Sequence, residues 1–134
     1  MKKNIKKKKG FTLIELIIVV AVLGILALIA VPKFGQIQQK SKVKADIATA
    51  KTIADVAAMK LADGNLGTYT TQSDLGNDIT QELQGGVPTP KAVSGGKYQL
   101  KVDASNNVEV HIVYGNNHGT DVTVYPTQTA TPYN

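Results

Sequence analysis

The distribution of hydrophobic residues sets the first part of the chain apart from the rest. Residues 11–31 read FTLIELIIVVAVLGILALIAV, with one charged residue, Glu15, and one hydroxyl side chain, Thr12. As an α-helix this run would span about 31 Å, close to the thickness of a bilayer's hydrocarbon core. It is longer than the apolar core of a signal peptide, and no small-residue cleavage site follows it. The run therefore predicts a membrane-spanning helix.

The next segment has the period of an amphipathic helix. Apolar residues recur at steps of three and four residues, which places them on one stripe: Val43, Ile47, Ala50, Ala54, Ala57 and Leu61. The charged residues, five lysines together with Asp46 and Asp55, are expected to face outward. Asp63-Gly64-Asn65 is typical of a helix end. One nearly continuous helix from about residue 11 to residue 63 would be about 80 Å long. Its first half must then be buried in a bilayer or against other copies of the chain.

The remainder predicts a loop region over 64–96, with a short helix at 77–84, followed by strands. Apolar side chains alternate along three segments: Tyr98, Leu100 and Val102; Val108, Val110, Ile112 and Tyr114; Val122 and Val124. Asn106-Asn107 is good turn chemistry between the first two. We predict an α+β fold in which the apolar helix stripe covers a three-stranded antiparallel meander. His111 falls on the polar face and is expected to be exposed, and residues 126–134 are expected to form a loose tail.

The positive charge of the chain is confined to its start. The formal net charge is +5, but six of the 15 lysines lie within the first nine residues. From Phe11 onward there are nine lysines and ten acidic residues, which gives a formal net charge of −1. A phosphate-binding surface needs a basic patch on the folded domain. Nucleic acid is therefore not expected as the main ligand.

Composition also argues against an enzyme or a metal protein. The chain has no cysteine and two histidines, and it contains none of the common hydrolase, phosphate-loop or zinc-protease motifs. The segment 116–121 is rich in oxygen ligands, which raises the possibility of calcium. It lacks the spacing of a calcium loop, so a polar hairpin connection is the expectation. We predict no catalytic residue, no cofactor and no metal site.

Two features of the apolar run need a physical reason. A carboxylate in hydrocarbon costs roughly 2–4 kcal/mol, so Glu15 either lies near the headgroups at a favourable helix end or meets a cation supplied by a partner. Gly24 and Pro32 both weaken the helix, because proline cannot donate to the carbonyl of Leu28. An ordinary kink would account for this pair equally well.

The start of the chain carries a specific resemblance. A lysine-rich leader, then Gly10-Phe11-Thr12-Leu13-Ile14-Glu15, then an apolar run closed by Pro32, resembles the class III signal of type IV pilins and pseudopilins. The resemblance implies that a prepilin peptidase cleaves between Gly10 and Phe11 and that Phe11 becomes N-methylated. It implies a role in filament assembly for Glu15, which docks the amine of a neighbouring subunit, and for Thr12 beside it. Gly24 and Pro32 resemble the segment that unwinds in assembled filaments.

This resemblance divides the chain into a cleaved leader (1–10), an assembly helix (11–35) and a soluble head (36–134). Within the head, the sequence pattern predicts a helix (36–63), a loop region (64–96), a sheet (97–125) and a tail (126–134). It implies a helical homo-oligomer with other pilins as possible neighbours, and a membrane assembly platform as a partner. The lysines ahead of the apolar run orient the amino terminus to the cytoplasm before the subunit reaches a surface pilus. The absence of cysteine and the short lysine leader are similar to Gram-positive members.

Three functions stay open at this point. The first is a subunit of a type IV pilus, major or minor, whose outer coat would carry any adhesive contact. The second is a pseudopilin of a secretion or DNA-uptake system. The third, from another class, is a single-pass anchored binding domain that never polymerises. A plain anchor needs neither the Gly10-Phe11 cleavage signal nor Glu15, which sets the third apart from the other two.

Overall fold

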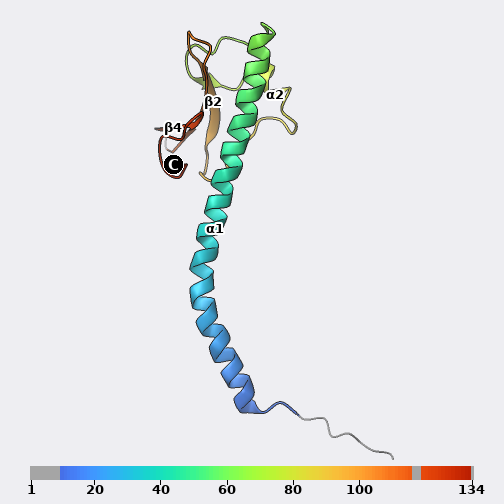
Figure 1. Cartoon of the computed structure of the whole chain (residues 1–134), viewed down its shortest axis with the longest axis vertical. Coiled ribbons are helices and arrows are strands. Elements are labelled where there is room, and N and C mark those ends of the chain that lie inside the picture. Colours follow the sequence, from blue (N-terminus) through green and yellow to red (C-terminus); the bar gives the residue numbers. More distant parts are fainter. Residues whose placement is uncertain (1–9, 116–118, 134) are drawn as a thin grey trace, which may run out of the picture. The chain divides into compact units, whose positions relative to one another are not determined.

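The computed structural model describes residues 10–115 and 119–133. Its elements are α1 (Leu13–Ala62), β1 (Ser73–Asp74), α2 (Asn77–Thr80), β2 (Lys97–Val102), β3 (Val108–Tyr114) and β4 (Thr120–Tyr125) (Figure 1). The chain divides into two compact units between Gln38 and Gln39, and α1 contributes to both. The long helix joined to a small antiparallel sheet confirms the predicted α+β class.

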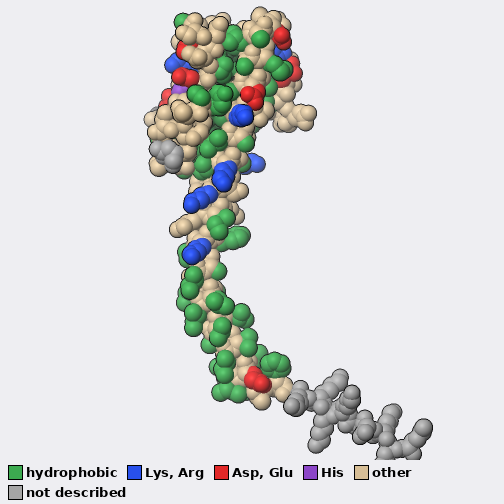
Figure 2. Space-filling model, viewed as in Figure 1, with side chains coloured by type: hydrophobic (Ala, Val, Ile, Leu, Met, Phe, Trp, Pro, Cys, Tyr) green, Lys and Arg blue, Asp and Glu red, His purple; other side chains and the backbone are tan. Residues whose placement is uncertain are grey.

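The unit that ends at Gln38 is helical from Leu13 onward and exposes its apolar side chains. Every large hydrophobic residue from Leu13 to Ile37 is about half exposed or more. Figure 2 shows these apolar side chains along the first half of α1. Among the described residues, α1 is the one helix long and apolar enough to cross a membrane. No residue within 10–115 and 119–133 covers this surface, as the sequence predicts.

The helix ends where the sequence places its stop. After Ala62, Gly64 adopts the left-handed conformation at φ 70°, and the amide of Asn65 donates to the carbonyl of Lys60 at 2.9 Å. Glycine reaches this conformation without the penalty that a Cβ atom brings. The sequence signal Asp63-Gly64-Asn65 is thereby confirmed.

The second unit contains one antiparallel sheet of order β1-β2-β3-β4. The pairing of β2 with β3 sets Val102 opposite Val108, and the turn between them has Asn106 at φ 63°. The carboxylate of Asp103 closes this turn by accepting hydrogen bonds from the Asn107 side chain and from the amides of Asn107 and Ser105. These bonds, those from Asn107 above all, lower the pKa of Asp103.

The sheet has one strand more than the three predicted. The additional strand, β1, comprises two residues and pairs with the edge of β2 at Ser73 and Leu100. The helix expected at 77–84 is also shorter, because α2 ends at Thr80 and the chain continues in turns. Two residues are too few to show alternation, so no sequence pattern indicates β1.

The core lies between one face of the sheet and the second half of α1. Ala50, Ala54 and Ala57 are almost fully buried, which lets the helix approach the strands closely. Larger side chains fill the remaining space, and those with an exposure below 2% include Ile53, Ile79, Leu100, Val110, Ile112, Val122 and Val124. The predicted stripe is therefore the face that covers the sheet, with Val43, Ile47 and Leu61 partly buried at its margins.

The loop between α1 and β1 is held by Asp78. One oxygen of its carboxylate accepts from the amide of Gly67 at 2.8 Å, and the other accepts from the hydroxyl of Tyr69 at 2.7 Å. The amide of Gly76 donates to the Tyr69 oxygen. A Cβ atom at Gly76 would lie 2.5 Å from the Asp78 carboxylate, so the contact requires glycine. Burial, together with the bond to Asp78, raises the pKa of Tyr69 to about 12.

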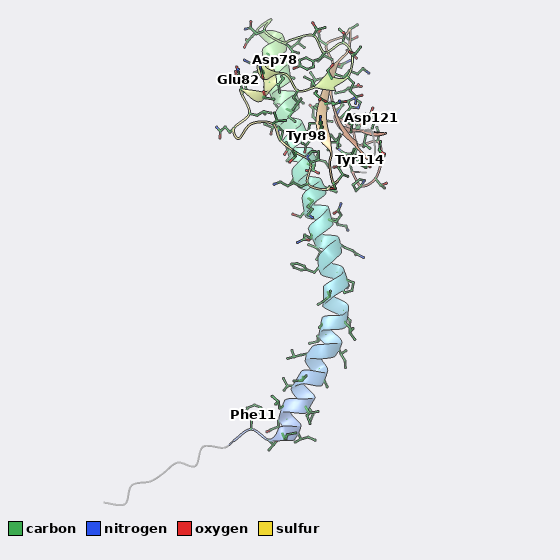
Figure 3. All side chains as sticks on the ribbon, turned by 180° about the vertical axis from the view of Figure 1, so that it is seen from behind. Phe11, Asp78, Glu82, Tyr98, Tyr114 and Asp121 are labelled. Carbon is green, nitrogen blue, oxygen red and sulfur yellow. The ribbon has the colours of Figure 1, made fainter. Side chains whose placement is uncertain are left out.

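Two predictions about the head are wrong, and they fail at the same place. Asp46, expected to face outward, is 1% exposed, and the tail, expected to be loose, buries Tyr133. The Asp46 carboxylate accepts from the amides of Lys91 and Ala92 at 2.7 and 2.8 Å and from the Tyr133 hydroxyl at 3.0 Å. Tyr98 extends from β2 (Figure 3) and donates to the Asp46 carbonyl at 3.2 Å. One buried carboxylate thus ties α1 to the loop before β2 and to the end of the chain.

Candidate assembly site

The side chains at the start of α1 form a reciprocal cap. The Thr12 hydroxyl and the Thr12 amide both donate to Oε2 of Glu15, each at 2.8 Å, and the Glu15 amide donates back to the Thr12 hydroxyl at 3.3 Å. This arrangement is the capping box, in which residues at the N-cap and N3 positions satisfy the free amides of the first turn. The Thr-x-x-Glu spacing ahead of an apolar run is the sequence signal for it, and we did not predict it.

The cap leaves half of the carboxylate available. Both contacts to the carboxylate use Oε2, and no described residue donates to Oε1 of Glu15. The residue is exposed, and its negative charge lies beside the positive end of the helix dipole. The cap therefore supports the explanation in which Glu15 lies near the headgroups at a favourable helix end. It also presents a second oxygen to a cation from outside the chain.

The peptide bond between Gly10 and Phe11 precedes the helix. Both residues lie outside regular secondary structure, and the Phe11 side chain is 83% exposed at the start of α1 (Figure 3). No other part of the described chain lies within 4 Å of a Cβ atom built at Gly10. The described residues therefore leave this bond open to an enzyme. Its cleavage would create an amine four residues before Glu15.

Gly24 and Pro32 lie on one face of α1. With Ala27, Leu28 and Val31 they line a shallow apolar hollow on the helix surface. The helix assignment is continuous through this segment, with Pro32 inside it. Pro32 has no amide hydrogen to donate to the Leu28 carbonyl, so one backbone hydrogen bond of the helix is missing. The missing hydrogen bond is a local weakness of α1.

The prediction that His111 is exposed is wrong. Its side chain is 9% exposed, its Nδ1 lies 3.0 Å from Oδ1 of Asp121, and its Nε2 lies 3.5 Å from Oε2 of Glu109. Alternation correctly places His111 on the sheet face away from α1. Asp121 and Thr123 of β4 and Glu109 of the same strand lie against it there, and alternation along a strand does not register such contacts.

The described residues contain no group of three or more His, Cys, Asp or Glu side chains that could hold a metal ion. The segment considered for calcium, 116–121, lies partly outside the described residues, since 116–118 are not among them. Asp121 is described, and it contacts His111. The site that the structure supports is therefore the start of α1, with its capped glutamate and exposed apolar surface.

The described chain thus combines an α+β unit with a long helix whose apolar first half is exposed and begins at a capped glutamate. Residues 5–31 match the family model of the prokaryotic N-terminal methylation motif. Over 113 residues the chain is 33% identical to a fimbrial protein of Pseudomonas aeruginosa, covering 81% of this chain and 68% of that protein. It is 34% identical over 115 residues to the type IV major fimbrial protein FimA of Dichelobacter nodosus, with the same coverage.

A further relative is the prepilin peptidase-dependent protein A of Clostridium perfringens, 28% identical over 123 residues that cover 80% of this chain and 86% of that protein. No solved structure gives a significant match. The chain belongs to the type IV pilin family, whose members include these fimbrial proteins, and it carries the family's prepilin leader.

Proposed function

We propose that this chain is the structural subunit of a type IV pilus filament. The observation that carries the proposal is the start of α1, where an exposed Phe11 is followed by the capped Glu15 and by an apolar helix that the described residues leave uncovered. The relatives named as fimbrial proteins support the same role. In this proposal the role is structural, and no step is catalysed by the chain itself.

Processing comes first in the proposed sequence of events. Residues 1–10 are the leader, and a prepilin peptidase cleaves after Gly10 and methylates the new amine of Phe11. Before cleavage the segment 11–35 spans the cell membrane, with the lysines of the leader in the cytoplasm. The head, 36–134, lies on the outer side. These boundaries follow the leader resemblance and the change from apolar to amphipathic sequence.

Assembly then exchanges one apolar environment for another. The helix leaves lipid and enters a bundle of identical helices, so burial of apolar surface changes little in the transfer. Specific contacts can therefore set the register of the subunits. The Phe11 amine of one subunit is placed beside Oε1 of Glu15 in its neighbour, while Oε2 keeps its bonds to Thr12. Charges of opposite sign attract strongly in this low-dielectric setting, and an unpaired charge there is costly.

The proposal is tested on filaments sheared from cells. We expect that deleting the gene abolishes a class of long surface filaments and that the wild-type chain is their main constituent. Re-expression of the chain restores them. Short periplasmic or envelope-confined assemblies with a secretion or DNA-uptake defect would instead indicate a pseudopilin. A chain that stays in the membrane as a monomer, with no filament, would indicate an anchored binding domain.

A further inference from the structure

Three lysines form a stripe on an exposed side of α1 within the head. Lys40, Lys44 and Lys51 are separated by four and seven residues, steps that return to nearly the same side of an α-helix. Figure 2 shows lysine side chains following this part of α1. All three are exposed, and within the part of the chain that the structure describes none of them forms an ion pair. The described residues therefore leave the charges of this helix face without an ionic partner.

Asp55 continues the stripe one turn beyond Lys51. It is exposed and forms no ion pair among the described residues. Lys51 and Asp55 stand four residues apart, but with the lysine first, which is the less favourable order on a helix. The two charges are thus available to partners outside the chain.

Asp55 also belongs to a larger acidic surface. With Asp103 and Glu109 it lines an open groove of about 480 Å³ between α1 and the β2–β3 turn. Lys101 contacts Glu109 at 3.2 Å, and it is the one lysine that forms an ion pair with any of these three acids in the described chain. A cation approaching Asp55 from outside therefore meets three carboxylates and one lysine.

The spacing of Lys51 and Asp55 repeats the spacing of Phe11 and Glu15. Both pairs are four residues apart with the cationic partner first. Four helical steps rise about 6 Å, and the extended residues before Leu13 lengthen the first interval to at most about 10 Å. In a helical filament, the screw operation that relates neighbouring subunits moves every residue by the same axial distance and also rotates it about the filament axis. The stagger that brings the Phe11 amine level with Glu15 of a neighbour therefore brings Lys51 close to the axial level of Asp55 of that neighbour.

We infer that Lys51 of one subunit pairs with Asp55 of the adjacent copy, at the mouth of that copy's acidic groove. The inference rests on the proposed filament function and adds a second ionic contact, between heads, to the one at the start of the helix. Lys44 and Lys40 follow on the same side and add positive charge next to the groove. The axial distance from Phe11 to Glu15 exceeds that from Lys51 to Asp55 by a few ångströms, and the long, flexible side chain of lysine can span this difference. A second copy of the chain is the partner at this groove, because its lysine stripe complements the acidic groove and the expected stagger brings the two together.

Charge reversal tests the pairing in cells that express only the variant chain. Lys51→Glu and Asp55→Lys each set like charges against each other, and each is expected to lower the yield of sheared filaments about fivefold. The double variant restores opposite charges between neighbours and is expected to recover at least half of the wild-type yield. Lys42→Glu is the matched control. It makes the same charge change on the other side of the helix and is expected to leave the yield unchanged.

Cross-linking tests proximity directly, because the native chain has no cysteine. Cells co-express a Lys51→Cys chain and an Asp55→Cys chain, and sheared filaments are treated with a short bismaleimide. We expect covalent dimers that contain one chain of each kind. The pair Lys42→Cys and Asp55→Cys is expected to give none.

The outcomes separate the pairing from the proposed function. Normal filaments without dimers, or single reversals that assemble normally, or a double variant no better than the singles, would overturn the pairing and leave the filament function intact. If the cysteine chains do not assemble, the charge-reversal series decides. Lysine variants that are lost from the membrane before assembly would indicate anionic lipid headgroups as the occupant instead. A wild-type chain that forms no filament overturns both proposals.

Discussion

Glu15→Gln is expected to reduce filament yield by at least an order of magnitude while the precursor is still inserted and cleaved. The substitution keeps the side-chain length and the helix cap, because glutamine serves at the N3 position of a capping box as glutamate does. It removes only the charge, and it leaves the neighbour's amine buried without its partner. A lone buried charge costs about 3–5 kcal/mol. The measurement is the amount of this chain in sheared filaments relative to the amount in membranes.

Two further variants separate the ionic role of Glu15 from its capping role. Thr12→Ala removes the two hydrogen bonds of the cap that use the Thr12 hydroxyl, but it keeps the bond from the residue 12 amide to Oε2 and the charge of Glu15. Loss of a cap costs about 1 kcal/mol, so assembly should fall only modestly. Glu15→Asp keeps the charge on a shorter stem and should retain part of the yield. If Thr12→Ala were as damaging as Glu15→Gln, the cap rather than the ion pair would explain Glu15.

Ile53→Asp is expected to unfold the head. Ile53 is fully buried between α1 and the sheet, and a carboxylate placed there has no cation to pair with. The cost of about 3–5 kcal/mol is a large part of the 5–15 kcal/mol that stabilises a typical domain. The fragment 36–134 should be soluble, monomeric and folded, with a cooperative thermal transition by circular dichroism. The variant fragment should lack that transition.

Met59→Asp is the matched control for this experiment. Met59 lies on the same helix but is 60% exposed, so the new carboxylate remains in water. We expect a loss of at most about 1 kcal/mol from the free energy of unfolding, part of it from placing an acid near the carboxyl end of α1. An equally stable Ile53→Asp fragment would show that the helix covers the sheet with another face.

The larger elements of this protein follow from its sequence because each has a long and regular signal. The helix over Leu13–Ala62 has an apolar run, a period of three to four residues and a glycine stop at Gly64. The strands β2, β3 and β4 alternate over six or seven residues. Steric fit and burial act on many residues at once in such elements, so errors at single positions do not change the result.

Individual polar residues are harder to place, because their environment is built by distant parts of the chain. Asp46 is charged and helical, which normally predicts exposure, yet its partners come from Lys91, Ala92 and Tyr133. No local pattern indicates a contact across 87 residues. His111 likewise lies against Asp121 of the adjacent strand β4 and Glu109 of its own strand. The Thr12–Glu15 cap is different, since its spacing is visible in the sequence.

The central claim is that the chain is processed at Gly10-Phe11 and then assembled through its apolar helix. The most direct test is the intact mass of this chain, taken from sheared filaments, with a tandem fragment spectrum of its amino terminus. We expect a chain of residues 11–134 that begins at N-methylated Phe11, and we expect Gly10→Val to leave full-length precursor in the membrane with no filament. Filaments whose subunits still begin at Met1 would contradict the account.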